Sequence, residues 1–117
     1  MSDSIPLTGP NPPSGLPVFP DPVKLLKAIA DKARYKALKE MAAGESFSVV
    51  SLAWIFRMHQ DTMGKHLKVI HQAGAIARVT PPGSDRRLQI YEIPEPFRRT
   101  SESGGPMLDY GVCVLRF

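Results

Sequence analysis

Residues 60–74, QDTMGKHLKVIHQAG, decide the fold of this chain. Met63, Leu67 and Ile70 recur at the spacing of one helical face, and Gly74 can adopt the left-handed backbone that ends a helix. The pattern predicts a helix from about Gln60 to Ala73. The residues that point mostly away from the apolar face are Thr62, Lys65, His66, Val69 and Gln72.

Three shorter helices are predicted upstream of this one. Each begins with an acidic or hydroxyl side chain that can accept hydrogen bonds from the free backbone N–H groups of a first helical turn. They are a helix that starts at Asp21-Pro22, a helix over 32–43 capped by Asp31, and a helix over 49–57 capped by Ser48. The last of these and the helix over 60–73 form a helix-turn-helix whose second helix has a polar and basic outer face.

A β-hairpin is predicted directly after the helix-turn-helix. Strand-forming residues over 75–80 and 87–93 flank the loop 81–85, PPGSD. A hairpin in this place is the wing of a winged helix. Further on, 107–117 (MLDYGVCVLRF) predicts one more strand, with Leu108, Tyr110, Val112 and Val114 on one face. The predicted fold is therefore mainly α with a small antiparallel β-hairpin (α+β), in the order α-α-α-α-β-β plus a C-terminal strand.

The N-terminal end is rich in proline. Of the twelve prolines, seven fall within the first 22 residues. Proline lacks a backbone N–H and fixes φ, so this segment forms neither a helix nor a central strand. We therefore expect three parts: a flexible proline-rich arm over 1–20, a winged helix-turn-helix domain over 21–96, and a linker with a C-terminal β-strand over 97–117.

The composition argues against several classes of protein. The single cysteine, Cys113, excludes an internal disulfide and a cysteine-only metal site. No apolar run approaches the ~20 residues of a membrane span, and the N-terminus lacks the order of a signal peptide, so we expect a cytoplasmic protein. No paired carboxylates, activated nucleophile or glycine-rich phosphate loop has a usable spacing. We therefore expect neither an enzyme nor a bound cofactor.

The three histidines do not suggest a metal site. His59 and His66 are seven residues apart, roughly 10 Å along a helix axis, which is too far for one small ion. His66 and His71 diverge by about 140° around the helix. We therefore expect no metal.

The positive charge is concentrated in one stretch. The net charge is +4, and eight of the fifteen Lys and Arg residues but only four of the eleven Asp and Glu residues lie between Arg57 and Arg99. The rest of the chain is therefore neutral. This asymmetry is typical of a surface that faces a polyanion, although a solvated basic face gives the same pattern.

Two stretches resemble a known family. Residues 28–34, AIADKAR, resemble the Ala-Leu-Ala-Asp-Pro-Thr-Arg motif of the ArsR-type (arsenical-resistance-repressor) winged-helix regulators. Residues 61–74, DTMGKHLKVIHQAG, resemble that family's Ser-Thr-Val-Ser-Arg-His-Leu-Lys-Val-Leu-Arg-Glu-Ala-Gly helix. The resemblance covers about 23–93. It implies a homodimeric transcription regulator that binds double-stranded DNA sequence-specifically, with the helix over 60–73 in the major groove and the wing over 75–93 on the backbone or in the minor groove.

The chain departs from that family where its founding members bind metals. Phe47, Ser48, Val49 and Val50 stand in place of a Cys-x-Cys pair, and no acidic, histidine-bearing C-terminal helix follows. A metal-sensing role is therefore not expected. Family members also dimerise partly through that final helix, which a linker and a strand replace here.

The residue types suggest roles in DNA binding. Early residues of a recognition helix reach base edges, whereas flanking cations and the wing hold phosphates. The candidate base readers are Gln60, Thr62, Lys65 and His66, and Asp61 is assigned to local capping or to a cytosine amine. The candidate phosphate contacts are Lys68, Arg78, Arg86 and Arg87, of which the last two also suit a minor groove. His66 equally suits a role in supporting the helix.

Several positions leave alternatives open. Gly64 replaces a serine of the family's helix, and either lets the helix approach DNA closely or is simply tolerated. Arg57 stands where the turn usually carries glycine, and either adopts a left-handed backbone or adjusts it. Trp54 either contacts a partner or is covered by the N-terminal arm or the C-terminal strand, with covering slightly favoured. Cys113 is expected to pack as a small hydrophobe. The alternative function is a winged helix that binds proteins without binding DNA.

Overall fold

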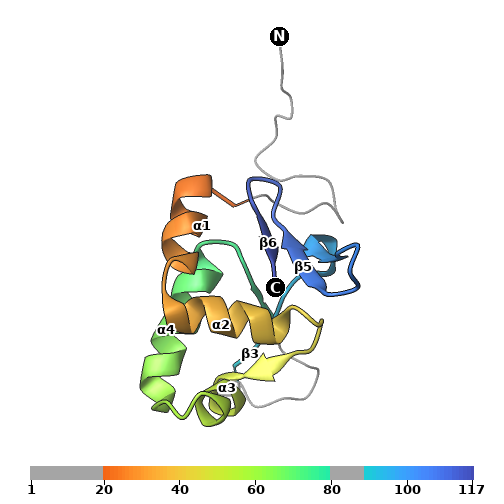
Figure 1. The fold of residues 1–117 in the computed structure, drawn as a ribbon. Coiled ribbons are helices and arrows are strands. Elements are labelled where there is room, and N and C mark those ends of the chain that lie inside the picture. Colours follow the sequence, from red (N-terminus) through yellow and green to blue (C-terminus); the bar gives the residue numbers. More distant parts are fainter. Residues whose placement is uncertain (1–19, 80–88) are drawn as a thin grey trace.

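The computed structural model describes residues 20–79 and 89–117, which form four α-helices and six short strands (Figure 1). The helices are α1 (Pro22–Ile29), α2 (Lys32–Met41), α3 (Val49–Ile55) and α4 (Gln60–Gln72). A β-hairpin follows α4, and a second group of strands ends the chain. The predicted α+β fold class is confirmed.

The helices begin at side chains that cap them. Asp21 and Asp31 each accept a hydrogen bond from the backbone N–H three residues later, both at 3.0 Å. The Ser48 hydroxyl does the same for α3, also at 3.0 Å. These three caps are as the sequence predicts. The cap of α4 is not among the predictions: His59 Nδ1 accepts a hydrogen bond from the Asp61 N–H at 3.2 Å.

Left-handed residues follow three of the four described helices. Gly44 follows α2 with a φ of 98°, and Gly74 follows α4 with a φ of 87°. Arg57, in the turn between α3 and α4, has a φ of 53°. The left-handed alternative for Arg57 is therefore correct, at a cost of about 1–2 kcal/mol for a residue that carries a Cβ.

The first sheet contains the wing. Its strands are β1 (Phe47–Ser48), β2 (Ala77–Val79) and β3 (Ile90–Glu92), in the order β1-β3-β2. All pairs are antiparallel, and both Phe47 and Arg78 lie opposite Tyr91. The sequence predicts the two hairpin strands but not β1, because two residues are too few to show an alternating pattern. The predicted loop 81–85 lies outside the described residues.

The C-terminal segment differs from its prediction. It forms a 3₁₀ helix and a second antiparallel sheet of order β4-β5-β6, rather than a linker and one strand. The elements are η2 (Glu95–Phe97), β4 (Arg98–Thr100), β5 (Pro106–Asp109) and β6 (Val114–Arg116).

A turn explains why the predicted single strand is wrong. Gly111 has a φ of 83°, and the Tyr110 N–H donates to the Cys113 carbonyl oxygen at 2.9 Å, so the chain reverses between β5 and β6. Leu108 and Tyr110 are consequently buried, whereas Val112 and Val114, expected on the same face, are exposed.

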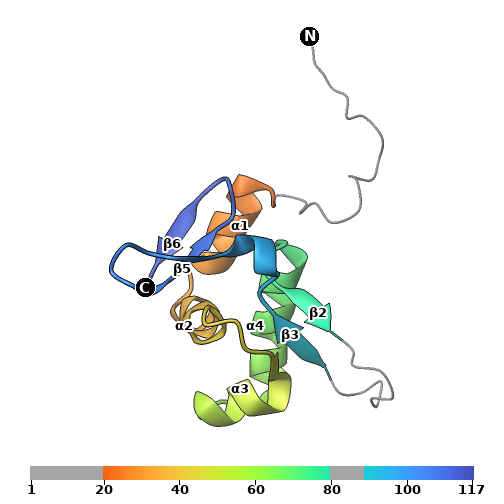
Figure 2. The same cartoon turned by 90° about the vertical axis from the view of Figure 1, so that its right-hand side faces the viewer.

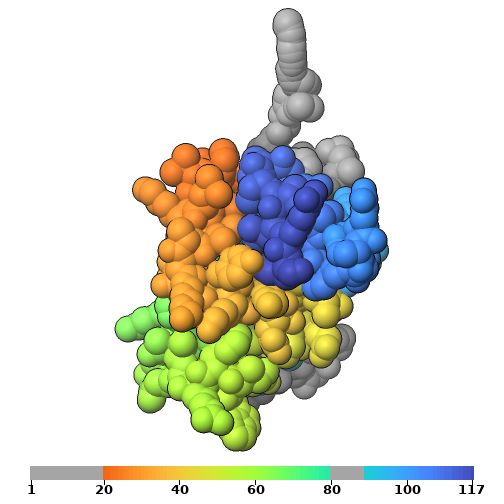
Figure 3. Space-filling model, viewed as in Figure 1, coloured from red at the N-terminus to blue at the C-terminus, as the bar shows by residue number. Residues whose placement is uncertain are grey.

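One core joins the helices to both sheets. Figure 2 shows α2 and α4 between the β2–β3 hairpin on one side and β5 and β6 on the other. The Tyr110 hydroxyl donates to the Ala75 carbonyl oxygen at 3.0 Å, just after α4. The largest fully buried side chains are Leu25, Leu38, Met41, Leu52, Met63, Leu67, Ile70, Ile93, Leu108 and Tyr110. The second sheet therefore completes the core, and its strands lie beside α1 on the surface (Figure 3).

Candidate nucleic-acid interface

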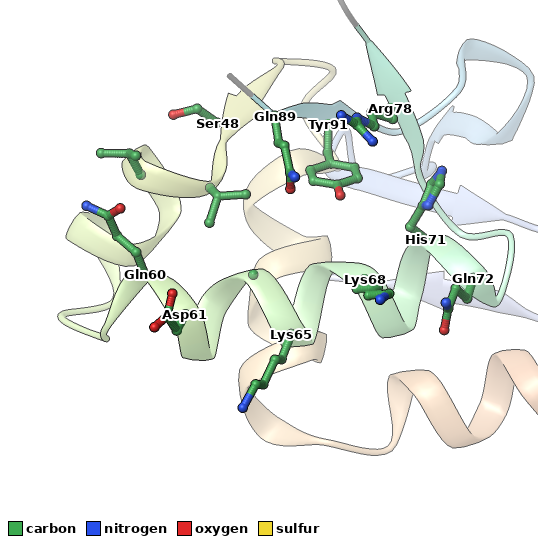
Figure 4. Close-up of a pocket in the computed structure, with 13 residues that line it drawn as sticks. Ser48, Gln60, Asp61, Lys65, Lys68, His71, Gln72, Arg78, Gln89 and Tyr91 are labelled. Atoms are coloured by element: carbon green, nitrogen blue, oxygen red, sulfur yellow. The ribbon is translucent and has the colours of Figure 1, made fainter. Parts of the chain in front are cut away.

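A groove with a volume of about 870 Å³ lies where α4 meets the start of α3 and the strands β2 and β3 (Figure 4). We call it the α4 groove. Of the described residues, those that line it are Ser48, Val49, Val50, Gln60, Asp61, Gly64, Lys65, Lys68, His71, Gln72, Arg78, Gln89 and Tyr91.

The helical repeat of α4 decides which of its side chains reach the groove. Met63, Leu67 and Ile70 are fully buried against the rest of the core. With 3.6 residues per turn, Gly64, Lys68 and the other lining residues of α4 fall on an adjacent face. This face is left free for the solvent or for a partner.

The wing side of the groove is built by the first sheet. Arg78 on β2 lies opposite Tyr91 on β3, so both side chains stand on one face of the sheet. The ring of His71 on α4 packs edge-on against Tyr91, with 5.6 Å between the ring centroids. This contact ties the last turn of α4 to the hairpin, and Figure 4 shows Gln89, which comes just before β3, beside Tyr91.

Five of the nine predicted site residues come together in the groove. They are Gln60, Asp61, Lys65, Lys68 and Arg78. Thr62 is exposed on α4 but is not among the lining residues. Arg86 and Arg87 lie outside the described residues.

His66 lies on a different side of α4. Its Nδ1 is 3.3 Å from Arg34 Nη1 and 3.8 Å from an Asp31 carboxylate oxygen, and its side chain is 21% exposed. The backbone N–H of Arg34 donates to the Asp31 carboxylate and, with the nearby charges of Arg34 and His66, holds the pKa of Asp31 below its usual value of 3.8. Of the two roles left open for His66, these contacts favour support of the helix.

The residues predicted from the sequence include Arg78, but neither the other lining residues outside α4 nor those at the C-terminal end of α4. Ser48, Val49 and Val50 reach the groove because β1 pairs with β3 and brings the start of α3 beside the wing. The helical repeat places His71 and Gln72 on the same face of α4 as Lys65 and Lys68. This spacing could have identified them as lining residues. Gln89 and Tyr91 depend on the register of the hairpin, which the sequence does not specify.

The electrostatic balance of the groove is positive. Its described lining residues include the cations Lys65, Lys68 and Arg78 and one carboxylate, Asp61. Cations at a concave surface attract polyanions, and glutamines among them can donate and accept hydrogen bonds at once. The groove can therefore hold a ligand that carries both negative charge and polar edges.

Trp54 and Cys113 lie outside the groove, and their surroundings bear on what the sequence predicts for each. Trp54 is 76% exposed, and the second sheet lies at the other end of the molecule from α3 (Figure 1). The covering of Trp54 by the C-terminal strand is therefore wrong, and the N-terminal arm that was the other predicted cover lies outside the described residues. Cys113 is half-buried against the core, as expected of a small hydrophobe. Burial, and then the charge of Asp109, raises the pKa of the Cys113 thiol, which lowers its reactivity.

Within 20–79 and 89–117, no three His, Cys, Asp or Glu side chains are grouped so that they could hold a metal ion. No helix in these same ranges is long and apolar enough to cross a membrane.

Comparison with known proteins adds a likeness in fold. No model of a protein family matches the chain, and no curated protein matches it in sequence. Among solved structures, HlyU from Vibrio cholerae N16961 is similar over 61% of this chain and 72% of its own, with 22% identity and a TM-score of 0.52. Rv0081 of M. tuberculosis is similar over 63% and 70%, with 24% identity and a TM-score of 0.52.

A third similar structure is HlyU from Vibrio vulnificus CMCP6, a transcriptional regulator, with 22% identity and a TM-score of 0.50. It covers 61% of this chain and 69% of its own. At these identities the likeness establishes the winged-helix fold. The resemblance to the arsenical-resistance-repressor family stays a prediction from the sequence.

Proposed function

We propose that this protein binds double-stranded DNA sequence-specifically and regulates transcription, as an ArsR-type winged-helix regulator. The α4 groove carries the proposal, because three cations and three glutamines share it with one carboxylate among its described lining residues. A duplex offers phosphates to the cations and base edges to the glutamines. The major groove, about 12 Å wide, admits an α-helix such as α4.

The residues divide by the part of the duplex that they contact. Gln60, Thr62 and Lys65 lie in the first half of α4 and read base edges, while Asp61 helps to hold the start of the helix. Lys68 and Arg78 bind phosphates on either side. Arg86 and Arg87 contact the backbone or the minor groove from the wing, and His66 supports α4.

We also propose that the protein acts as a homodimer. α1 exposes Val23 and Leu26, and the β5–β6 turn and β6 expose Val112 and Val114. Both Figure 1 and Figure 2 show the β5–β6 turn next to the start of α1. Exposed apolar side chains on neighbouring elements favour an interface. A two-fold dimer would offer two α4 helices to the half-sites of an inverted repeat.

The protein acts by binding alone, in the cytoplasm, without a metal or an organic cofactor. This follows from the residue pattern, which has no nucleophile paired with a base and no metal-ligand spacing. Regulation of a promoter needs no chemistry beyond occupancy of the site.

A second candidate is a module that binds another protein instead of DNA. It is favoured by the outer face of α3, where Val50 is 50% and Trp54 76% exposed, with Ile55 beside them. Large apolar side chains in such a cluster are typical of protein contacts.

The test is binding of duplex DNA, measured by fluorescence anisotropy at several salt concentrations. Wild type is compared with Lys65→Ala/Lys68→Ala and with a matched control, Lys36→Ala/Lys39→Ala, which removes the same charge from exposed positions on α2. A further variant, Lys65→Ala/Arg86→Ala/Arg87→Ala, tests the wing.

The groove variant is expected to bind more weakly and to reduce the slope of log K against log salt by about one unit per lysine that contacts a phosphate. The α2 control should keep most of the wild-type affinity. Equal losses in the two double variants would refute the α4 groove as the interface. Wild-type binding no stronger than that of an unrelated basic protein would refute DNA binding and favour the Trp54 surface.

A further inference from the structure

An apolar notch lies within the α4 groove, among its charged and polar side chains. It is formed by Val49 and Val50 at the start of α3 and by Gly64 on α4. A Cβ placed on Gly64 would lie 3.8 Å from Val49 Cγ1, and apart from its own helix and chain neighbours it would meet no other described atom within 4 Å. The absent side chain of Gly64 therefore leaves room for one methyl group against a valine.

The notch is exposed to a ligand in the groove. Val50, in the first turn of α3, is 50% exposed although it is a branched apolar residue. Glycine weakens a helix relative to alanine, and the space at Gly64 would accept alanine. A helical glycine against Val49 and an exposed Val50 in the same groove are thus unfavourable for the free protein, but they form a surface that suits a small apolar group.

The surroundings of the notch indicate what that group belongs to. Lys65 and Lys68 line the groove on the same face of α4, so a ligand whose methyl group enters the notch meets two cations, which favours an anionic ligand. Gln60, Gln72 and Gln89 line the same groove, and glutamine pairs with the N6 and N7 edge of adenine. In a duplex, adenine is paired with thymine, whose 5-methyl group projects into the major groove.

We propose that the notch formed by Val49, Val50 and Gly64 receives the 5-methyl group of a thymine, so that the groove selects an A·T pair at this position. This inference rests on the proposed binding of DNA in the α4 groove. It makes Gly64 a specificity-determining residue, because any side chain there would occupy the space of the methyl group.

The first experiment removes the methyl group from the DNA alone. A preferred duplex is selected from a random pool with the full chain, and each thymine is then replaced in turn by deoxyuridine. At the thymine that the notch contacts, the replacement should weaken binding by about fourfold, the worth of one buried methyl group. The other thymines of the duplex serve as internal controls.

The second experiment fills the notch from the protein side. In Gly64→Ala the new methyl group should exclude that of thymine, so the variant should bind the uracil duplex more tightly than the thymine duplex. Val50→Thr keeps the shape of the side chain but replaces a methyl with a hydroxyl, and it should reduce the difference between the two duplexes. Circular dichroism checks that both variants are folded.

The outcomes distinguish a failure of the thymine site from a failure of sequence-specific DNA binding. A preferred duplex without any uracil-sensitive thymine, or a Gly64→Ala variant that ranks the two duplexes as wild type does, overturns the thymine site and leaves DNA binding intact. A pool that yields no preferred duplex overturns the proposed function, and the thymine site with it.

Discussion

Replacing Gly64 with alanine is expected to stabilise the free protein. Gly64 is the fifth of the thirteen residues of α4, where its helical backbone is compatible with alanine. In a helix interior, glycine is less favourable than alanine by about 0.8–1.0 kcal/mol. The added Cβ would be in ordinary van der Waals contact with Val49 Cγ1, at 3.8 Å, so no packing cost offsets the gain.

The expected magnitude is therefore about 0.8–1 kcal/mol in the free energy of unfolding, or roughly 4–8 °C in Tm for a domain of this size. Urea unfolding followed by far-ultraviolet circular dichroism measures it. A stability equal to or below that of wild type would refute the reasoning, because it would mean that the helix or its contact with Val49 is not as described.

Gly44→Ala is the matched control, with the same chemical change and the opposite expected sign. Gly44 has a φ of 98°, which is unfavourable for alanine by about 1–2 kcal/mol. Its Cβ would also collide with the Arg98 guanidinium, which lies across this position. The guanidinium is the far end of a flexible side chain and can move, so the backbone dominates the expected loss. An unchanged stability in Gly44→Ala would contradict the left-handed turn.

Three further predictions concern stability. Asp31→Asn should keep the cap of α2 and lose less stability than wild type as the pH falls below about 4, because the hydrogen bond from the Arg34 N–H lowers the pKa of Asp31 and the stability that this gives wild type is lost in acid. An equal loss of stability in the two proteins would contradict this. Tyr110→Phe should lose about 1 kcal/mol with the hydrogen bond to the Ala75 carbonyl oxygen, as measured by urea unfolding. Burial raises the pKa of Tyr110 above its usual 10.0, so wild type should lose stability as the pH rises beyond about 10, and the variant should lose less. Trp54→Ala should change the unfolding free energy by no more than about 0.5 kcal/mol, because Trp54 is 76% exposed, and a larger loss would indicate that it is covered.

Local signals account for the parts of the fold that the sequence predicts. Asp21, Asp31 and Ser48 begin helices because their side chains satisfy backbone N–H groups within three residues, and no distant contact is needed. Gly44 likewise ends α2 through its own backbone freedom. The left-handed backbone of Arg57 is one of the two alternatives that the sequence leaves open, and its φ of 53° selects it.

The sequence-based prediction is wrong where contacts between residues far apart in the chain determine the structure. Leu108, Tyr110, Val112 and Val114 alternate as in a single strand, but the turn at Gly111 divides them, and only the first two contact the helical core. The alternation could not show this, because it is the same for one strand as for the two arms of a short hairpin.

The candidate site was predictable on α4 and at Arg78 of β2. The spacing of Lys65 and Lys68 places them on one face of a helix, and the groove includes both. The start of α3 and the inner face of β3 join them through the pairing of Ser48 with Ile90, which no local pattern indicates. His66 illustrates the same limit, since its contact with Arg34 depends on how α4 packs against α2.

The bond between Tyr110 and Ala75 has a practical consequence for protein engineering. A chain cut after Pro96, at the end of the predicted winged helix-turn-helix region, would lose the buried side chains of Phe97, Leu108 and Tyr110. The Ala75 carbonyl oxygen, just after α4, would then lose its hydrogen bond from the Tyr110 hydroxyl. A fusion protein or a shortened chain should therefore retain the residues through Phe117, whose ring packs on Tyr35 of α2 with 5.4 Å between the centroids.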